Sequence, residues 1–273
     1  MPATVEQLLA RVSKPARYTG GEFNSITKPW ESALVRVVLA YPDAYDIGMS
    51  NMGIGILYDL LNQREAVLCE RVYAPWEDME AEMRREDVLL WSLENRRPLR
   101  DFDVVGFTLQ YELTYTNILN MLDLGGIPVR SADRSEGHPL VIAGGSGAFN
   151  PEPLAPFIDA FVIGEGEDAI LELAGRVEDW KRAATPRRER LRQLLAMPGI
   201  YVPAFYDARY DEEGKFAGLE PAVPGAPPVI RRRIVEKLPP ALVRPIVPFL
   251  QTVHDRAAVE IQRGCTQGCR FCQ

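Results

Sequence analysis

Three cysteines near the carboxyl end are the residues in this sequence whose spacing could support chemistry. Cys265, Cys269 and Cys272 form the pattern Cys-x3-Cys-x2-Cys, and the sequence ends at Gln273. A short loop that contains glycine lets three thiolates converge on one centre, and soft sulfur ligands suit an iron-sulfur cluster or zinc. The pattern therefore predicts a metal site at the end of the chain.

The number of ligands bears on which metal is expected. Structural zinc normally takes four protein ligands, and neither histidine lies in the loop, because His254 precedes Cys265 by eleven residues and His138 is far away. A cluster of four irons held by three cysteines leaves one iron open to a small molecule. Two alternatives stay open, namely three unrelated cysteines in a solvated tail and half of a zinc knuckle completed by another chain.

The cysteine loop resembles the signature of the radical S-adenosylmethionine (radical SAM) superfamily. The resemblance rests on the three cysteines, on the aromatic Phe271 just before the third, and on the preceding apolar run Ala-Ala-Val-Glu-Ile at 257–261. It implies that the loop follows the first strand of a β/α barrel and that Cys265, Cys269 and Cys272 are ligands of a [4Fe-4S] cluster. It also implies that the open iron binds the amino and carboxylate groups of S-adenosylmethionine, with Phe271 near the adenine.

The activity implied by this resemblance is the reductive cleavage of S-adenosylmethionine. An electron from the reduced cluster produces a 5'-deoxyadenosyl radical, which abstracts hydrogen from a substrate that the sequence does not identify. The electron donor expected for such chemistry is a reductant such as a flavodoxin or a ferredoxin.

Composition excludes several other classes of function. The formal net charge of -7 and the isoelectric point near 5.1 argue against a general nucleic-acid or membrane-surface binder, so the basic runs at 187–190 and 231–233 are interpreted as solvated faces or linker. No apolar run reaches the roughly 18 residues of a membrane span, and the amino terminus does not have the pattern of a secretory signal. Four cysteines, three of them in one cluster, favour a reducing cytoplasm, and Cys69 is interpreted as an ordinary strand residue.

From Leu34 onward, short apolar segments alternate with segments of helical period. This alternation predicts an α/β fold with a Rossmann-like parallel sheet. The expected strands are 34–40, 67–73, 104–109, 139–143 and 160–163, and the expected helices have apolar faces near 54–61, 76–85, 115–122 and 170–177.

Glycines and polar residues follow three of these strands. In an open parallel sheet, ligands bind beyond the carboxyl ends of the strands, and glycine lets backbone approach a ligand closely. The candidate cofactor-binding residues are Thr108, Gln110, Gly144, Gly145, Gly164, Glu165 and Gly166. A purely structural explanation of the Gly144-Gly145-Ser146-Gly147 cluster, as a tight turn, carries equal weight. The first loop lacks Gly-x-Gly-x-x-Gly, so a nicotinamide site is not supported.

The same loops resemble those of the cobalamin-binding-type Rossmann domain that precedes many radical SAM barrels. In that domain the loops hold the nucleotide tail of the corrinoid. This sequence departs from the pattern at Asp46-Ile47-Gly48, where Asp-x-His-x-x-Gly would supply a histidine to cobalt. Cobalamin therefore remains an alternative cofactor, and its ligation by histidine is not supported.

A wider resemblance, to one uncharacterised bacterial radical SAM family, covers nearly the whole chain and gives no substrate. It rests on residues 14–18, 50–53, 73–76, 109–117 and 149–153.

Four segments are expected along the chain. They are an amino-terminal preamble (1–33), the Rossmann-like domain (34–182), a connector with a hairpin and a proline-rich stretch (183–250), and the start of a radical SAM barrel with the cluster loop (251–273). A barrel needs roughly two hundred further residues. We therefore expect this chain to be a fragment without catalytic activity of its own. Two functions stay open: the amino-terminal part of a radical SAM enzyme, and a corrinoid- or nucleotide-binding module whose tail takes a structural or regulatory metal.

Overall fold

The computed structural model describes residues 4–238, 240–254, 256, 258–264 and 266–270. Its centre is a six-stranded sheet with the order β2-β1-β3-β4-β5-β6. The first five strands are parallel and β6 is antiparallel to β5, so the predicted α/β, Rossmann-like class is confirmed. The strands are β1 Val35–Tyr41, β2 Val67–Tyr73, β3 Val104–Thr108, β4 Leu140–Gly144, β5 Ala160–Val162 and β6 Ile200–Tyr201.

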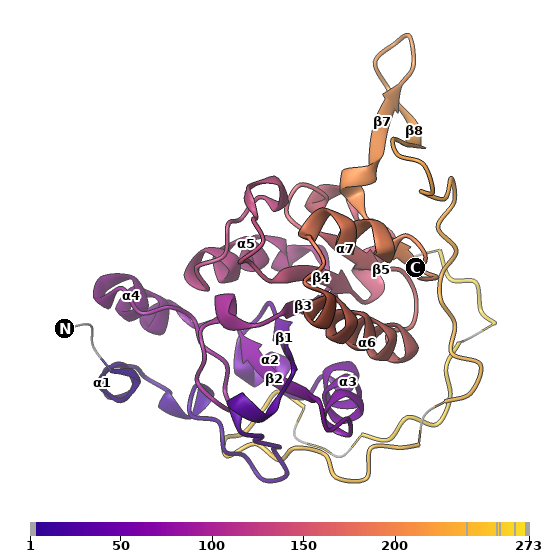
Figure 1. Cartoon of the computed structure of the whole chain (residues 1–273). Coiled ribbons are helices and arrows are strands. Elements are labelled where there is room, and N and C mark those ends of the chain that lie inside the picture. Colours follow the sequence, from indigo (N-terminus) through magenta and orange to yellow (C-terminus); the bar gives the residue numbers. More distant parts are fainter. Residues whose placement is uncertain (1–3, 239, 255, 257, 265, 271–273) are drawn as a thin grey trace.

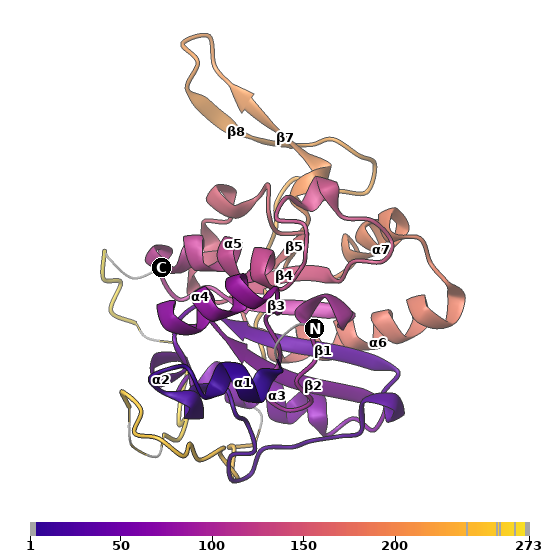
Figure 2. The same ribbon diagram turned by 90° about the vertical axis from the view of Figure 1, so that its left-hand side faces the viewer.

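Helices cover both faces of the sheet (Figures 1 and 2), which explains why the central strands are apolar on both sides. One face packs against α1 Val5–Leu9, α4 Glu77–Glu86 and α5 Tyr115–Leu124. The other face packs against α3 Met52–Asn62, α6 Glu167–Ala183 and α7 Arg187–Leu194. A further short helix, α2 Tyr45–Gly48, follows β1. The 3-10 helices are Pro15–Arg17, Trp30–Ser32, Leu99–Asp101, Glu112–Thr114, Ser131–Asp133, Ser146–Phe149, Glu152–Leu154 and Pro203–Phe205.

Local sequence explains how α3, which borders the site described below, is placed. The side chain of Asn51 accepts a hydrogen bond from the Ile54 amide at 3.0 Å and so caps the first turn. Ile54, Tyr58 and Leu61 then follow at helical spacing and are buried against the sheet. The start of α3 is therefore fixed at the carboxyl edge of the sheet, next to the loop that follows β1.

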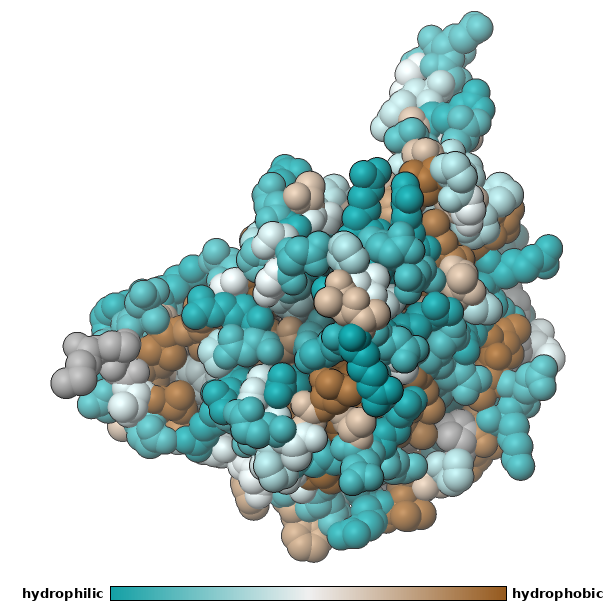
Figure 3. All heavy atoms as spheres, viewed as in Figure 1, coloured by the Kyte–Doolittle hydropathy of each residue, from teal (hydrophilic) through white to brown (hydrophobic). Residues whose placement is uncertain are grey.

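The core extends on both sides of the segment 34–182. Leu8 and Tyr18 of the preamble are buried on one face of the sheet, and Leu194, Met197 and Val202 are buried on the other. The predicted hairpin is confirmed as β7 Tyr206–Tyr210 and β8 Phe216–Pro221. It projects from the body in Figure 1, and its outer part is largely hydrophilic in Figure 3. The division into four segments stays a prediction.

The chain after β8 runs along the surface of the sheet domain and contacts it at successive points. Gly164 forms a parallel bridge with Arg233, and Phe23 forms an antiparallel bridge with Val247. Further along, the Val253 amide donates to the Asp46 carbonyl at 2.9 Å. This connector therefore returns to the carboxyl edge of the sheet.

The barrel strand expected at 257–261 is not seen in residues 258–261, which have no regular secondary structure; residue 257 lies outside the described residues. A strand is stabilised by hydrogen bonds to a neighbour, and these residues pair with no strand in the described part of the chain. Among the described residues, no helix combines the length and the apolar character needed to cross a membrane.

Candidate functional site

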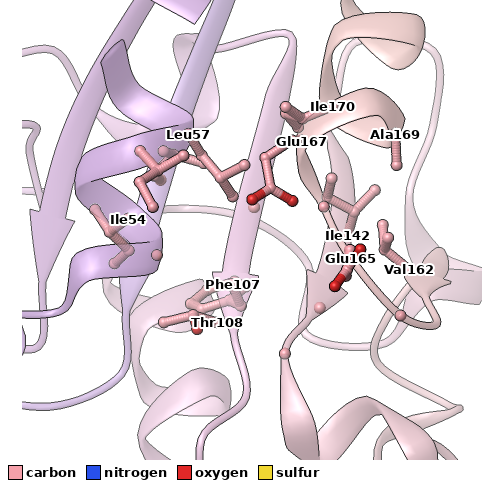
Figure 4. Close-up of a pocket in the computed structure, with 18 of the residues that line it drawn as sticks. Ile54, Leu57, Phe107, Thr108, Ile142, Val162, Glu165, Glu167, Ala169 and Ile170 are labelled. Carbon is pink, nitrogen blue, oxygen red and sulfur yellow. The ribbon is translucent and has the colours of Figure 1, made fainter. Parts of the chain in front are cut away.

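A cavity of about 310 Å³ lies at the carboxyl edge of the sheet, between the sheet, α3 and α6. Figure 4 shows side chains from both helices and from β3, β4 and β5 pointing toward this space. All seven candidate residues outside the cysteine loop line it: Thr108, Gln110, Gly144, Gly145, Gly164, Glu165 and Gly166. The structure thus brings together residues from three separate loops, and whether they bind a cofactor stays a prediction.

The floor of the cavity is apolar. Ile54 and Leu57 of α3 lie on one side, Ile170 of α6 lies on the other, and Ile142 of β4 belongs to the sheet between them. Gly106 of β3 also lines the space, and a Cβ there would meet Leu39 only at the ordinary contact distance of 3.4 Å. The glycine therefore leaves room above the middle of the sheet. The space suits an apolar or flat molecular group.

Two of the candidate glycines have a structural reason of their own. Gly145 has φ +109°, and a Cβ on it would lie 2.7 Å from the Leu109 carbonyl oxygen. Gly164 has φ +105°, and a Cβ on it would lie 2.2 Å from the Arg233 carbonyl oxygen. Both positions require glycine because another part of the backbone approaches closely. The turn explanation therefore accounts for Gly145 without a ligand, and the approach of the Arg233 backbone accounts for Gly164.

The polar candidates after β3 contact each other and the next loop. Gln110 Nε2 donates to Thr108 Oγ1 at 2.5 Å, and Ser146 Oγ donates to the Gln110 carbonyl at 3.2 Å. Tyr111 donates its hydroxyl proton to Asp43 at 2.7 Å, and this hydrogen bond raises the Tyr111 pKa to about 12. The loops after β1, β3 and β4 are thereby joined by side chains at the carboxyl edge of the sheet.

Three carboxylates and one guanidinium form the remaining side of the mouth. Arg263 Nε donates to Glu260 at 2.5 Å, Arg263 Nη2 donates to Glu167, and Arg263 Nη1 lies 3.7 Å from Glu165. The hydrogen bonds to Glu260 and Glu167 raise the pKa of Arg263, and Arg263 in turn lowers the pKa of Glu260. Arg263 is the only cation among the described residues that line the cavity. The mouth therefore carries three negative charges against one positive charge, which disfavours an anionic group there.

The cysteine loop is only partly described. Cys265, Phe271 and Cys272 lie outside the described residues, whereas Cys269 is described and exposed. No group of three or more histidine, cysteine or acidic side chains gathers as metal ligands within the described ranges. Cys69 is buried in β2, as predicted.

The described backbone around the cysteines fits a tight ligand loop. Gly264 and Gly268 have φ +79° and +60°, and a Cβ on either would meet no atom within 4 Å. These left-handed conformations, which other residues adopt with strain, stand directly before Cys265 and Cys269 in the sequence. Three thiolates on such a loop are a donor set that suits an iron-sulfur cluster.

Sequence reasoning missed part of the site. Glu167 belongs to the Gly-Glu-Gly-Glu sequence at 164–167 but was not predicted as a site residue, and neither Glu260 nor Arg263 was expected at the cavity. Arg263 and Glu167 are 96 positions apart in the sequence. Many oppositely charged residues lie about that far apart in any sequence, so the sequence alone does not indicate that these two are in contact. The one available signal is that Glu167 follows a predicted strand at the ligand-binding edge.

Comparison with known proteins adds two findings. The model of a family described as "Radical SAM proteins, N-terminal" matches residues 53–203. The chain is also similar to the uncharacterized protein MJ0966 of Methanocaldococcus jannaschii, with 24% identity over 245 residues. That similarity covers 86% of this chain and 40% of the relative, so the chain spans well under half of the relative's length.

Proposed function

The chain belongs to the family of radical SAM protein N-terminal regions, and from this premise we propose that it is the amino-terminal part of a radical SAM enzyme. In this proposal Cys265, Cys269 and Cys272 hold a [4Fe-4S] cluster and Phe271 lies near the adenine of S-adenosylmethionine. When bound, the cluster supplies the electron for reductive cleavage of S-adenosylmethionine to a 5'-deoxyadenosyl radical. For the whole protein, the proposal includes an electron donor such as a flavodoxin or a ferredoxin. It names no substrate.

The observation that carries this proposal is the Cys-x3-Cys-x2-Cys spacing in a chain of this family. The cysteines follow the matched region, residues 53–203, so the two lines of support come from different parts of the sequence. The chemistry of three ligands adds a reason, because it leaves one iron for a small molecule. The four-segment division, with the cluster loop at 251–273, is proposed together with this function.

The protein's own residues would hold the cluster and orient the approach to it. The left-handed Gly264 and Gly268 would turn the backbone so that the thiolates can converge. Arg263, two positions before the first cysteine, is fixed by carboxylates at the mouth of the cavity. The described part of the chain thus supplies an anchored entry to the ligand loop.

The test is anaerobic reconstitution with iron and sulfide of the whole chain and of a Cys265→Ala, Cys269→Ala, Cys272→Ala variant. A Cys69→Ala variant is the matched control, because Cys69 is buried in β2 away from the loop. Electron paramagnetic resonance of the reduced samples is recorded with and without S-adenosylmethionine. We expect a [4Fe-4S] signal in the chain and in the Cys69 variant, no signal in the triple variant, and a change of the signal on adding S-adenosylmethionine.

The outcomes separate the parts of the proposal. A cysteine-dependent signal that S-adenosylmethionine leaves unchanged would support the cluster ligands while removing the proposed cosubstrate site from this chain. A chain that forms no cluster, or forms the same cluster without the three cysteines, would contradict the proposal.

A second candidate function is supported by the cavity. Seven predicted residues surround an apolar space of about 310 Å³ at the edge where an open parallel sheet binds its ligands. The second candidate is a corrinoid- or nucleotide-binding module with a structural or regulatory metal tail. In it the apolar space would take a flat ring or base, and any phosphate would lie away from the three carboxylates at the mouth. To test it, the same samples are dialysed against hydroxocobalamin or adenosine. If the triple variant retains the added ligand and the parent chain forms no cluster, the module would be favoured over the enzyme.

A further inference from the structure

The mouth of the cavity and the approach to the cysteine loop are held together by ion pairs. Arg263 belongs to the connector, whereas Glu165 and Glu167 belong to the loop after β5 and the start of α6. The side chain of Arg263 is 23% exposed and that of Glu167 is 9% exposed. Charges that are this well shielded from water interact more strongly than a typical surface pair.

The contact joins two parts of the chain, because Glu260 and Arg263 themselves form part of the cavity wall. Around them, Ala258 and Val259 lie beside Met52 and Ile56 of α3 in a smaller hollow. The connector therefore closes one side of the cavity, and the cysteine loop begins at that point. A molecule in the cavity would be close in space to the entry of the cysteine loop.

We propose that Glu167, with Glu165, is a positioning residue that docks Arg263 and so fixes the start of the cysteine loop at the mouth of the cavity. The consequence of this docking, a cluster held next to the cavity, rests on the proposed function. The docking itself is a property of the chain without a metal. It can therefore be tested separately.

Other features of the two residues agree with this role. In the described part of the chain, the hydrogen bonds given to the Glu167 carboxylate come from Arg263 alone. Glu165 has a second task, because its carboxylate accepts from the Val235 amide and its own amide donates to the Arg233 carbonyl at 3.0 Å. Glu167 is therefore the residue whose replacement tests the docking with the least effect on the fold.

The contact is tested by carbodiimide cross-linking of an Arg263→Lys variant without metal. Carbodiimide joins an amine only to a carboxylate that touches it, and mass spectrometry identifies the partner. We expect links from position 263 to Glu167 or Glu165 as well as to Glu260, and only the Glu260 link after the further changes Glu165→Gln and Glu167→Gln. The Glu260 link is an internal control, since that pair is only three positions apart.

The consequence is tested by the rate at which a chelator removes the cluster. We expect Glu167→Gln to lose the cluster about fivefold faster, which corresponds to the loss of one well-placed ion pair. A double exchange, Glu167→Arg with Arg263→Glu, keeps one cation among three carboxylates and is expected to restore slow loss. Glu220→Gln, which removes an exposed hairpin ion pair with Arg209, is the matched control and is expected to change nothing.

Failure of the inference and failure of the proposed function are distinguishable. Links confined to Glu260, or equal rates of cluster loss in the parent chain and in Glu167→Gln at equal thermal stability, would overturn the positioning role while leaving the cluster in place. Absence of a cluster from the parent chain would instead contradict the proposed function. In that case the cross-links still decide whether Arg263 is docked.

Discussion

Asp46 illustrates how a residue at a motif position can be engaged in a structural role. It stands where a histidine-ligating corrinoid domain would have the aspartate of Asp-x-His-x-x-Gly. Its carboxylate accepts hydrogen bonds from Arg17 Nε at 2.5 Å and from Lys14 Nζ at 3.1 Å. Burial alone would raise its pKa, but the hydrogen bonds from Arg17 and Lys14 outweigh burial and hold the pKa below its ordinary value of 3.8. Asp46 therefore ties the preamble to α2.

This ion pair gives a pH-dependent prediction. Because the pKa of Asp46 is lower in the folded state, its stabilisation is present above pH 3.8 and is lost as the pH falls through the folded-state pKa. Asp46→Asn is expected to lower the free energy of unfolding by about 1–2 kcal/mol at pH 7. Urea unfolding at pH 7, 5 and 3.5 should show the difference from the parent chain shrinking at the lowest pH.

The control for Asp46 is Asp207→Asn, on the exposed hairpin strand β7. It should leave the stability and its pH dependence unchanged. A deficit in Asp46→Asn that is the same at all three pH values would show that the charge of Asp46 does not carry its contribution.

At the scale of elements, the turn between β5 and α6 fixes where the connector meets the sheet domain. The backbone of Gly164 bridges to Arg233, and Gly164 has a positive φ. Arg233 also pairs with Glu172 of α6 at 2.8 Å. The turn, the helix and the connector thus form one joint beside the cavity.

Replacement of Gly164 by alanine tests this joint. Gly164→Ala should lower the free energy of unfolding by about 2–3 kcal/mol, because it combines a left-handed φ with a Cβ that meets the Arg233 carbonyl. Gly175→Ala is the matched control within α6, where a Cβ meets no atom within 4 Å. It should raise the free energy of unfolding by about 0.5–1 kcal/mol, since alanine favours a helix interior. Thermal and urea unfolding measure both, and equal effects of the two changes would contradict the explanation of the turn.

The elements that sequence predicts well are those with long apolar patterns. The five parallel strands were expected within one or two residues, because buried strands between helices are bounded by turn residues. The antiparallel β6 has only two residues, Ile200 and Tyr201, and gives no periodic signal. The run at 257–261 has the composition of a strand, but composition does not supply the neighbour with which a strand must pair.

The candidate site was predictable to the extent that topology determines it. The rule that ligands lie beyond the carboxyl ends of parallel strands placed Thr108, Gly144 and Glu165 on one edge, and the structure brings them to one cavity. The docking of Arg263 on Glu167 depends on the path of the connector, which contains no regular element from which a path can be predicted.

At the scale of the whole molecule, the preamble is bound to the body by buried charges. Arg71 of β2 donates to Glu22 of the preamble at 2.9 Å and to Glu94 at 2.8 Å, and all three side chains are at most 2% exposed. Tyr45 donates a further hydrogen bond to Glu22 at 2.9 Å. Burial opposes the charge on Glu22, yet Arg71 holds the pKa of Glu22 below its ordinary value. The preamble therefore supplies one of the two carboxylates that pair with the buried Arg71.

The preamble also anchors the connector. The Val247 amide donates to the Phe23 carbonyl at 3.0 Å, and Asn24 Nδ2 donates to the Pro245 carbonyl at 2.8 Å. Figure 1 shows these two segments, distant in sequence, running side by side below the sheet. Since the connector continues from here to the cavity mouth, the position of the cysteine loop depends on the preamble as well as on Glu167.

Removal of the Glu22 charge tests the attachment of the preamble to the sheet. Glu22→Ala leaves Arg71 with one of its two carboxylates and is expected to lower the free energy of unfolding by about 3–5 kcal/mol, as for other broken buried pairs. The control removes residues 209–218 of the hairpin, keeps Leu219, which packs against the core, and joins the ends with two glycines. Those ends are adjacent, because Ala208 and Leu219 are paired across the hairpin, so the loss should stay below about 1 kcal/mol. Urea unfolding measures both changes. If the hairpin deletion cost more than Glu22→Ala, the stability would reside in the projecting hairpin and not in the attachment of the preamble to the sheet.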